Sequence, residues 1–279
     1  MTRAGAAVLG APIAHSLSPI LHQAAYDALG LTDWTYRAVH CVPEQLPEVL
    51  RELADEGLVG VSLTMPLKRA VLALLARIDD TAARIGVVNT VLFQSDEQWR
   101  GINTDIHGIV ASLRAAGVSL APPDTVWVIG AGATAASTIA ALAELGVQRT
   151  VVAARRPDAG AQLADLARGL GVSVEVSDWP PAPGSAGAAL VVSTAPAGAT
   201  DELAVGLGRV AGVLLDVVYS PWPTPLAAAW ERGGGQVIGG LELLVEQAAE
   251  QVRLMTGQQA PVESMRAAGQ AALASRPMT

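Results

Sequence analysis

The chain has 279 residues, a formal net charge of −8 and a pI of about 5.0, and it is 51% hydrophobic, 16% charged and 4% aromatic. This composition excludes a disordered chain and is typical of a folded protein with an aliphatic core. The acidic charge balance argues against nucleic acid or an anionic membrane as a partner. The single cysteine, Cys41, excludes an internal disulfide and favours a cytoplasmic location. The sequence has no apolar run of the about 18–20 residues that a membrane helix needs.

Strand and helix signals alternate through the first hundred residues. The predicted strands are 6–10, 34–40, 58–63, 87–93 and 98–102, and the predicted helices are 19–29, 43–55 and two short ones within 66–86. Ser18 is the expected N-cap of the first helix, because Pro19 follows it at the first helical position. A turn at Ser95 and Asp96 joins the last two strands.

The alternation is more regular in the second half. A helix is expected from 105 to about 116, a linker at 121–124 and a loop at 179–187. The predicted strands are 125–129, 149–154, 189–193 and 213–218, and the predicted helices are 134–145, 157–170, 240–255 and 261–274. This pattern predicts an α/β fold whose parallel sheet is covered by helices on both faces.

The predicted strand 125–129 runs directly into a glycine-rich turn and a helix. Gly130 permits the tight turn, Gly132 lets the backbone approach a pyrophosphate, and Ala135 lets helix and strand pack closely. The N-terminus of the helix supplies N–H groups for phosphates. The turn therefore predicts a dinucleotide site that includes Ala131 and Ala133, and the alternative is a glycine-rich turn that binds nothing.

The residues after the next strand indicate which dinucleotide binds. An NAD site usually has a carboxylate there to hold the ribose 2′-hydroxyl, whereas this chain has Arg155 and Arg156. Two guanidinium groups can bind a 2′-phosphate, so NADP(H) is favoured over NAD(H). The alternative is that both are ordinary surface cations. We also expect Thr194, in the loop after the strand 189–193, and Gly240 to contact the cofactor.

Lys68 is the only lysine in a chain with 17 arginines. Arginine can supply surface charge and ion pairs, but it does not give up its proton at ordinary pH, whereas a lysine ammonium can. The exception therefore indicates a position that needs an ammonium, unless a single lysine remains there by chance.

Seven short segments occur in an order and spacing that resembles the shikimate dehydrogenase family. They are 12–19 (PIAHSLSP), 60–68 (GVSLTMPLK), 86–90 (GVVNT), 101–108 (GINTDIHG), the glycine-rich turn, 216–226 (DVVYSPWPTPL) and 240–249 (GLELLVEQAA). The resemblance implies a substrate-binding domain of residues 1–105 plus 240–279 and a Rossmann NADP-binding domain of residues 106–239, with the active-site cleft between them. The reaction implied is the NADPH-dependent reduction of 3-dehydroshikimate to shikimate.

The resemblance also implies roles for individual residues. Lys68 and Asp105 match the catalytic pair, and Ser16 and Ser18 match the hydroxyls that hold the substrate carboxylate. Thr64, Asn89 and Gln247 match family residues that bind the ring hydroxyls of the substrate. Tyr219 matches a residue that lies near the substrate carboxylate. Neutral hydroxyl and amide groups suit a small polyhydroxy acid, because an unmatched buried hydroxyl costs about 1–3 kcal/mol. Each also has a structural alternative: an N-cap for Ser18, a turn for Asn89, an ordinary hydrogen bond for Tyr219 and a core amide for Gln247.

We expect Lys68 to remain cationic in the reductive direction, because a neighbouring Asp105 carboxylate favours the ammonium. It then stabilises the developing oxyanion and can deliver a proton. The separations of the four histidines do not suggest a metal site. The chain departs from the family pattern at Ser62 and Ser193, where asparagine is common, which leaves quinate or an aminoshikimate as alternative substrates. A non-catalytic NADP(H) sensor is a further alternative, and a monomer or a homodimer is expected.

Overall fold

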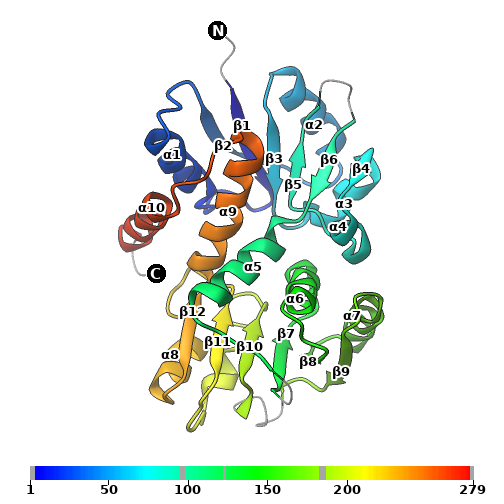
Figure 1. Cartoon of the computed structure of the whole chain (residues 1–279), viewed down its shortest axis with the longest axis vertical. Helices are drawn as coiled ribbons and strands as arrows, with labels where there is room; N and C mark the ends of the chain where they lie inside the picture. The colour runs from blue at the N-terminus through cyan, green and yellow to red at the C-terminus, as the bar shows by residue number, and fades with distance from the viewer. Residues whose placement is uncertain (1–3, 95–97, 122–123, 182–186, 277–279) are drawn as a thin grey trace. The chain divides into compact units, whose positions relative to one another are not determined.

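The computed structural model describes residues 4–94, 98–121, 124–181 and 187–276 (Figure 1). The chain divides into two compact units, one of residues 1–108 with 244–277 and one of residues 109–243 with 278–279. Helices α5 (Thr104–Ala115) and α9 (Gly240–Thr256) each contribute residues to both units. The predicted turn at Ser95 and Asp96, positions 122–123 of the predicted linker and most of the predicted loop 179–187 lie outside the described residues.

The first unit contains a six-stranded mixed sheet in the order β2-β1-β3-β5-β6-β4. Its strands are β1 (Gly5–Gly10), β2 (Thr35–His40), β3 (Gly60–Leu63), β4 (Arg77–Ile78), β5 (Thr90–Leu92) and β6 (Arg100–Ile102). Strands β1, β2 and β3 are parallel, whereas β5 runs antiparallel to both β3 and β6. The short strand β4, which the sequence did not predict, pairs with β6 in parallel.

Helices of the first unit cover both faces of its sheet. They are α1 (Ser18–Ala28), α2 (Leu46–Asp55), α3 (Leu67–Ala70), α4 (Asp80–Ile85) and α10 (Val262–Ala274), with the 3₁₀ helix η1 (Val71–Leu74) between α3 and α4. The prediction that Ser18 caps α1 is wrong. The helix already includes Ser18, its N-cap is Leu17, and no side chain bonds the cap. The Ser18 hydroxyl is therefore not used at the helix start.

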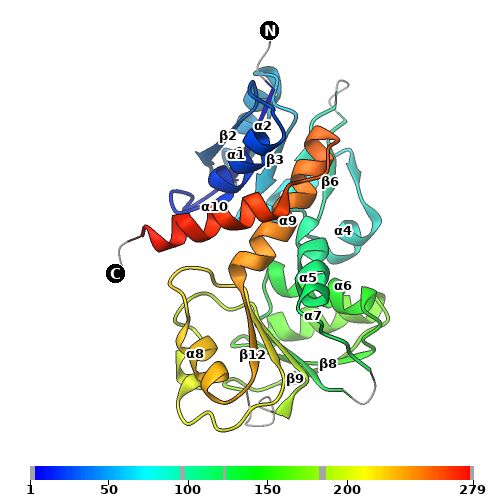
Figure 2. The ribbon, with the colours of Figure 1, turned by 60° about the vertical axis from the view of Figure 1, so that its left-hand side comes forward.

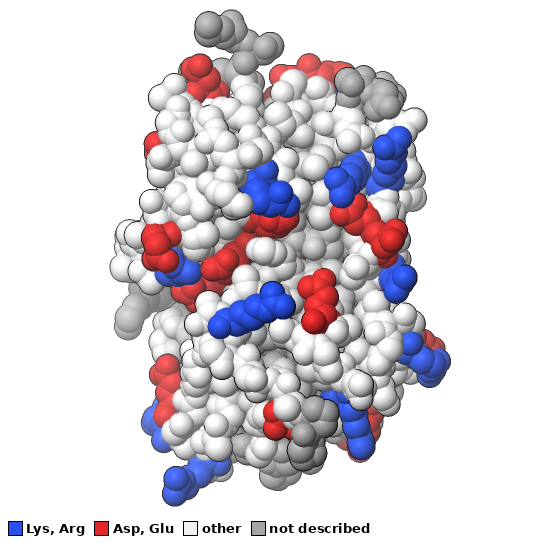
Figure 3. Space-filling view, in the orientation of Figure 1, with Lys and Arg blue, Asp and Glu red and all other residues white. Residues whose placement is uncertain are grey.

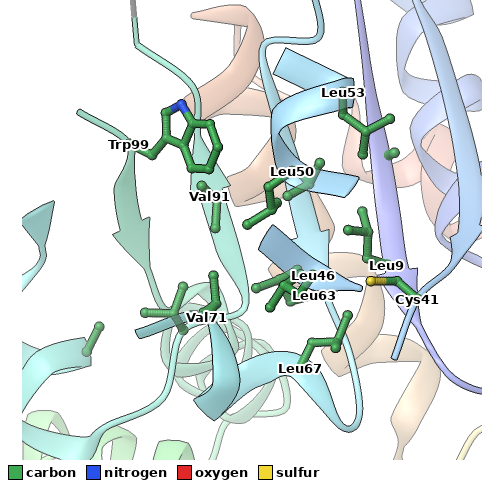
Figure 4. Close-up of a cluster of buried hydrophobic side chains, with 14 residues drawn as sticks. Leu9, Cys41, Leu46, Leu50, Leu53, Leu63, Leu67, Val71, Val91 and Trp99 are labelled. Atoms are coloured by element: carbon green, nitrogen blue, oxygen red, sulfur yellow. The ribbon is translucent and has the colours of Figure 1, made fainter. Parts of the chain in front are cut away.

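A leucine-rich core lies between α2 and one face of this sheet. Leu46, Leu50 and Leu53 recur at helical spacing on α2 and pack against Leu9 and Leu63, which lie on neighbouring strands (Figure 4). Cys41 is fully buried in the same cluster, as a small apolar side chain would be (Figure 4). Because strand side chains alternate, the residues next to Leu9 and Leu63 face the other side of the sheet, toward α1.

The second unit is a parallel six-stranded sheet in the order β12-β11-β10-β7-β8-β9. The strands are β7 (Val126–Ile129), β8 (Arg149–Ala153), β9 (Ser173–Ser177), β10 (Leu190–Ser193), β11 (Val213–Asp216) and β12 (Gln236–Gly239). Helices α6 (Ala133–Glu144) and α7 (Pro157–Gly169) lie on one side of the sheet and α8 (Pro225–Arg232) on the other (Figure 2). A 3₁₀ helix, η3 (Asp201–Ala204), packs against α8. The order reverses between β7 and β10, which places a switch point at the glycine-rich turn.

The strands β9 and β12 and the helices α8 and η3 of the second unit were not predicted from the sequence. Strand β9 is an edge strand with mostly exposed residues, so it has no apolar run.

Basic and acidic side chains are interspersed among uncharged ones on the face shown in Figure 3. In the described part of the chain, no helix is long and apolar enough to cross a bilayer.

Candidate active site

Lys68 and Asp105 form an ion pair in the first unit, with 2.5 Å between Nζ and Oδ2. Lys68 lies on the one-turn helix α3, which begins just after β3, and Asp105 lies in the first turn of α5. The two side chains are only 15% and 9% exposed. A carboxylate in the first helical turn is favoured by the positive end of the helix dipole. The pair is therefore largely buried, and its attraction is stronger there than in water.

Asn89 connects this ion pair to the rest of the unit. The Asn89 Nδ2 donates to Asp105 Oδ1 over 2.8 Å, so the carboxylate has one oxygen for Lys68 and one for Asn89. The Asn89 Oδ1 accepts from the backbone N–H of Thr104 at 2.7 Å and from the hydroxyl of Thr90 at 3.0 Å. Asn89 is 1% exposed, so its interpretation as a simple turn residue does not describe its contacts.

Helix α9 adds two glutamines to the same network. Gln247 Oε1 lies 3.3 Å from Asn89 Nδ2, and Gln247 Nε2 donates to Leu244 O over 3.0 Å. Gln251, one turn further along, donates to Gln247 Oε1 over 2.9 Å. Gln247 is 7% exposed and faces inward, as its helical row predicted. The structure thus brings Lys68, Asp105, Asn89 and Gln247 together by direct hydrogen bonds.

Thr64 directly follows β3, whereas Ser16 lies in the segment between β1 and α1, and Ser18 is the first residue of α1. The backbone N–H of Ala11 donates to Met65 O, which ties the two segments together. Ser16 Oγ accepts from the backbone N–H of Ser18 at 3.2 Å, so the two serines form one compact turn. Thr64 O accepts from Leu67 N–H at the start of α3, one residue before Lys68.

The glycine-rich turn of the second unit has the backbone that a dinucleotide site needs. Gly130 has φ +113, and a Cβ at this position would lie 2.4 Å from Thr194 Oγ1. Gly132 is the N-cap of α6, with open space where a Cβ would be and no side chain bonding the cap. Ala135 is fully buried against the sheet. The N-terminus of α6 is therefore uncapped by protein and flanked by small residues, which leaves its N–H groups available to an anion.

Other predicted cofactor residues also lie in the second unit. Arg155 and Arg156 are exposed at the end of β8, directly before α7. The first residue of α9, Gly240, could not carry a Cβ without approaching Val217 O to 2.2 Å. Tyr219 is half-buried and belongs to this unit, not to the one that contains Lys68.

The loop that carries Tyr219 is fixed by a buried carboxyl group. Asp216 is 1% exposed, accepts from Thr224 Oγ1 at 2.7 Å and accepts from the Val218 backbone N–H at 3.2 Å. Burial raises the pKa of Asp216, and these hydrogen bonds partly oppose the rise. Thr224 also caps α8 by accepting from Ala227 N–H at 3.1 Å. The carboxyl group therefore joins the end of β11 to the start of α8.

Sequence reasoning missed several polar residues that the structure adds to the site. Thr90, Thr104 and Gln251 are at most 1% exposed and bond to Asn89 or Gln247. Gln251 lies four residues after Gln247 on the same helical row, and this spacing was the one available signal. The arrangement provides a cation and a carboxylate with fixed partners, which can stabilise a developing oxyanion and exchange a proton with it.

Two family models match parts of the chain. The one described as the shikimate dehydrogenase substrate binding domain matches residues 8–91, and the one described as the shikimate 5'-dehydrogenase C-terminal domain matches residues 240–268. A curated shikimate dehydrogenase (NADP(+)) from Paramagnetospirillum magneticum is 37% identical over 264 residues, which cover 92% of this chain and 94% of the relative.

Solved structures agree with these matches. The crystal structure of Mycobacterium tuberculosis shikimate dehydrogenase is 43% identical, with a TM-score of 0.85 over 96% of this chain and 99% of that one. A Thermus thermophilus shikimate 5-dehydrogenase, solved in complex with NADP(H) and shikimate, is 34% identical, with a TM-score of 0.83 and the same coverage of 96% and 99%.

Proposed function

The chain belongs to the shikimate dehydrogenase family, and we propose that it reduces 3-dehydroshikimate to shikimate with NADPH, reversibly, as a step of aromatic amino-acid biosynthesis. The observation that carries this proposal is the largely buried Lys68–Asp105 ion pair, which Asn89 holds by a hydrogen bond to Asp105. A non-catalytic NADP(H)-binding protein would not need such a pair. Quinate and aminoshikimate are not proposed as substrates, because the relatives described above are named shikimate dehydrogenases.

The first unit is proposed to bind the substrate. In this proposal Ser16 and Ser18 hold the carboxylate, and the ring hydroxyls bind to Thr64, Asn89 and Gln247. Support comes from the turn that joins the serines, the backbone bonds between their segment and that of Thr64, and the network that joins Asn89 to Gln247. The same proposal assigns Tyr219 to the substrate carboxylate.

The second unit is proposed to bind NADP(H), and its residues fit that group. Gly130 and Gly132 leave room for a pyrophosphate at the uncapped N-terminus of α6, together with Ala131, Ala133 and Ala135. Arg155 and Arg156 are proposed to bind the 2′-phosphate, and the absence of a carboxylate at the end of β8 suits that charge. Thr194, which packs against Gly130, and Gly240 are proposed as the remaining cofactor contacts.

The chemistry follows from the ion pair. When bound, NADPH supplies a hydride to the ketone carbon. Lys68 is proposed to stabilise the negative charge that develops on the ketone oxygen and to give that oxygen a proton. Asp105 holds the Lys68 ammonium with one oxygen and is itself held by Asn89 through the other, so the ammonium keeps its position during the reaction. A cytoplasmic location and a monomeric or homodimeric state stay predictions.

Removing the Lys68 ammonium tests the proposal. The assay uses shikimate and NADP⁺ as substrates and follows the absorbance of NADPH. We expect Lys68→Ala to lower kcat by about a hundred- to a thousandfold with little change in KM, which is typical of losing an oxyanion-stabilising group. The matched control is Arg69→Ala, which removes the neighbouring exposed cation and should leave kcat within about twofold of wild type, as is usual for a surface substitution. A rise in KM alone for Lys68→Ala would contradict the catalytic role, and an inactive wild-type protein would contradict the proposed function.

A further inference from the structure

Gln251 is a buried polar residue that the mechanism above does not use. It lies one helical turn after Gln247 on α9 and is 1% exposed. Its Nε2 lies 2.9 Å from Gln247 Oε1, 3.0 Å from Thr90 Oγ1 and 3.2 Å from Thr104 Oγ1. Thr90 is the first residue of β5 and Thr104 the first of α5, so this one carboxamide joins three elements of the site.

Two backbone groups fix which way the carboxamides in this network point. The Thr104 N–H can only donate, so the Asn89 atom 2.7 Å from it is Oδ1. The Leu244 carbonyl can only accept, so the Gln247 atom 3.0 Å from it is Nε2. Gln247 Oε1 therefore faces Gln251, and an oxygen needs a donor opposite it. Gln251 must present its Nε2, as it does.

We propose that Gln251 is a positioning residue for Gln247. It holds the Gln247 side chain so that Gln247 Nε2, and not Gln247 Oε1, faces the substrate. The inference rests on the proposed function, in which Gln247 contacts a ring hydroxyl. One amide hydrogen of Gln247 goes to Leu244 O, and the other has no acceptor among the described residues. Because Gln247 Oε1 is engaged by Gln251 and Asn89, Gln247 can meet a hydroxyl only as a donor.

Glutamine at this position supplies a buried donor at the cost of an unpaired acceptor. Gln251 Oε1 is buried and has no hydrogen-bond partner in the described part of the chain. A buried acceptor without a donor lowers stability, and an apolar side chain of the same shape would avoid this loss. Methionine would remove this unpaired oxygen, but it would also remove the donor that Gln247 Oε1, Thr90 Oγ1 and Thr104 Oγ1 share. Supplying that donor is the property that distinguishes glutamine here.

The test is Gln251→Met, which keeps the length of the side chain and removes its donor. We expect KM for shikimate to rise about three- to tenfold, the effect of one lost hydrogen bond, with KM for NADP⁺ essentially unchanged. The melting temperature should fall, because Nε2 also contacts Thr90 Oγ1 and Thr104 Oγ1. In Gln247→Met the substrate contact itself is lost, so adding Gln251→Met should raise KM no further. The matched control, Gln258→Met, alters an exposed glutamine and should leave KM at its wild-type value.

Gln251→Glu provides a rescue that depends on pH. Burial raises the pKa of a carboxyl group, and its protonated form can donate to Gln247 Oε1. We expect KM for shikimate to be close to the wild-type value while the carboxyl is protonated and to rise as it ionises with increasing pH, relative to wild type at the same pH. The discriminating result is the recovery of KM at low pH relative to Gln251→Met, which has no donor at any pH.

Two kinetic outcomes would overturn the inference: an unchanged KM in Gln251→Met, or effects of Gln251→Met and Gln247→Met that multiply in the double variant. A separate readout is the NMR signal of the Gln247 side-chain amide, identified by its loss in Gln247→Met. Its hydrogens should exchange slowly in wild type and faster in Gln251→Met. If wild type does not turn over shikimate, the proposed function fails, and this exchange comparison alone decides whether Gln251 holds Gln247.

Discussion

Lowering the pH is expected to destabilise the first unit through His22. The ring of this histidine is fully buried, stacks on Tyr36 with 3.8 Å between centroids, and uses Nδ1 to bond Ser18 O at 2.9 Å. Because a carbonyl only accepts, Nδ1 carries the hydrogen and the proton must add at Nε2. Nε2 is buried without a partner in the described part of the chain. Burial lowers the pKa of His22 from 6.5 to about 4, and the bond to Ser18 only partly opposes this.

The size of the effect follows from the two pKa values. The unfolded chain binds the proton near pH 6.5 and the folded protein only near pH 4, so protonation favours unfolding. The contribution of neutral His22 to stability is complete above pH 6.5 and is lost as the pH falls toward 4. From about pH 8 to about pH 5 the free energy of unfolding should fall by about 2 kcal/mol through this group, and by about 3 kcal/mol below pH 4.

Native-state hydrogen exchange of the α1 amides measures this free energy for the unit that contains His22. Wild type is compared with His22→Phe, which keeps an aromatic ring against Tyr36 but cannot titrate. Between about pH 8 and about pH 5, the difference in the free energy of unfolding between wild type and His22→Phe should change by about 2 kcal/mol. The control His40→Asn, at an exposed position, should behave as wild type. Parallel pH dependence in wild type and His22→Phe would refute the reasoning.

Two further predictions concern the second unit. Replacing both Arg155 and Arg156 by glutamine should raise KM for NADPH by about tenfold or more and change KM for NADH little, because only NADPH carries the 2′-phosphate. Steady-state kinetics with each cofactor measure the two KM values. Gly130→Ala should lower the melting temperature and weaken NADPH binding, because φ is +113 and the added Cβ would lie 2.4 Å from Thr194 Oγ1; calorimetry measures both quantities.

Each of these has a discriminating control. Arg168→Gln removes an exposed cation on α7 and should not alter the preference for NADPH. If the Arg155 and Arg156 variant loses affinity equally for NADPH and NADH, the two arginines do not form a 2′-phosphate site. Gly146→Ala also replaces a glycine of positive φ, but with open space around its Cβ. It should destabilise the protein without weakening NADPH binding, and equal effects of both glycine variants on binding would contradict a special role for Gly130.

The sequence determined those features that depend on local pattern. Alternating apolar runs and helical periods predicted the parallel sheet of the second unit, and the glycine-rich turn was predicted to follow β7, where Gly130 adopts a backbone conformation that favours glycine. Two of the elements it missed have weak local patterns, whereas α8 was missed although Thr224 and Pro225 mark its start. Strand β9 is a largely exposed edge, and the two-residue strand β4 exists only because it pairs with β6.

The candidate site shows the same division. A solitary lysine and the motifs that carry the family resemblance led to the prediction of Lys68, Asp105 and Asn89 as site residues. The part that Gln251 plays could not be named, because an inward glutamine on an amphipathic helix has the same pattern as a core position. Only the tertiary structure places Gln251 against Thr90, which is 161 residues away in the chain, and against Thr104, 147 residues away. Hydrogen bonds act over about 3 Å, so the partner of a buried amide is decided by packing and not by the spacing of residues along the chain.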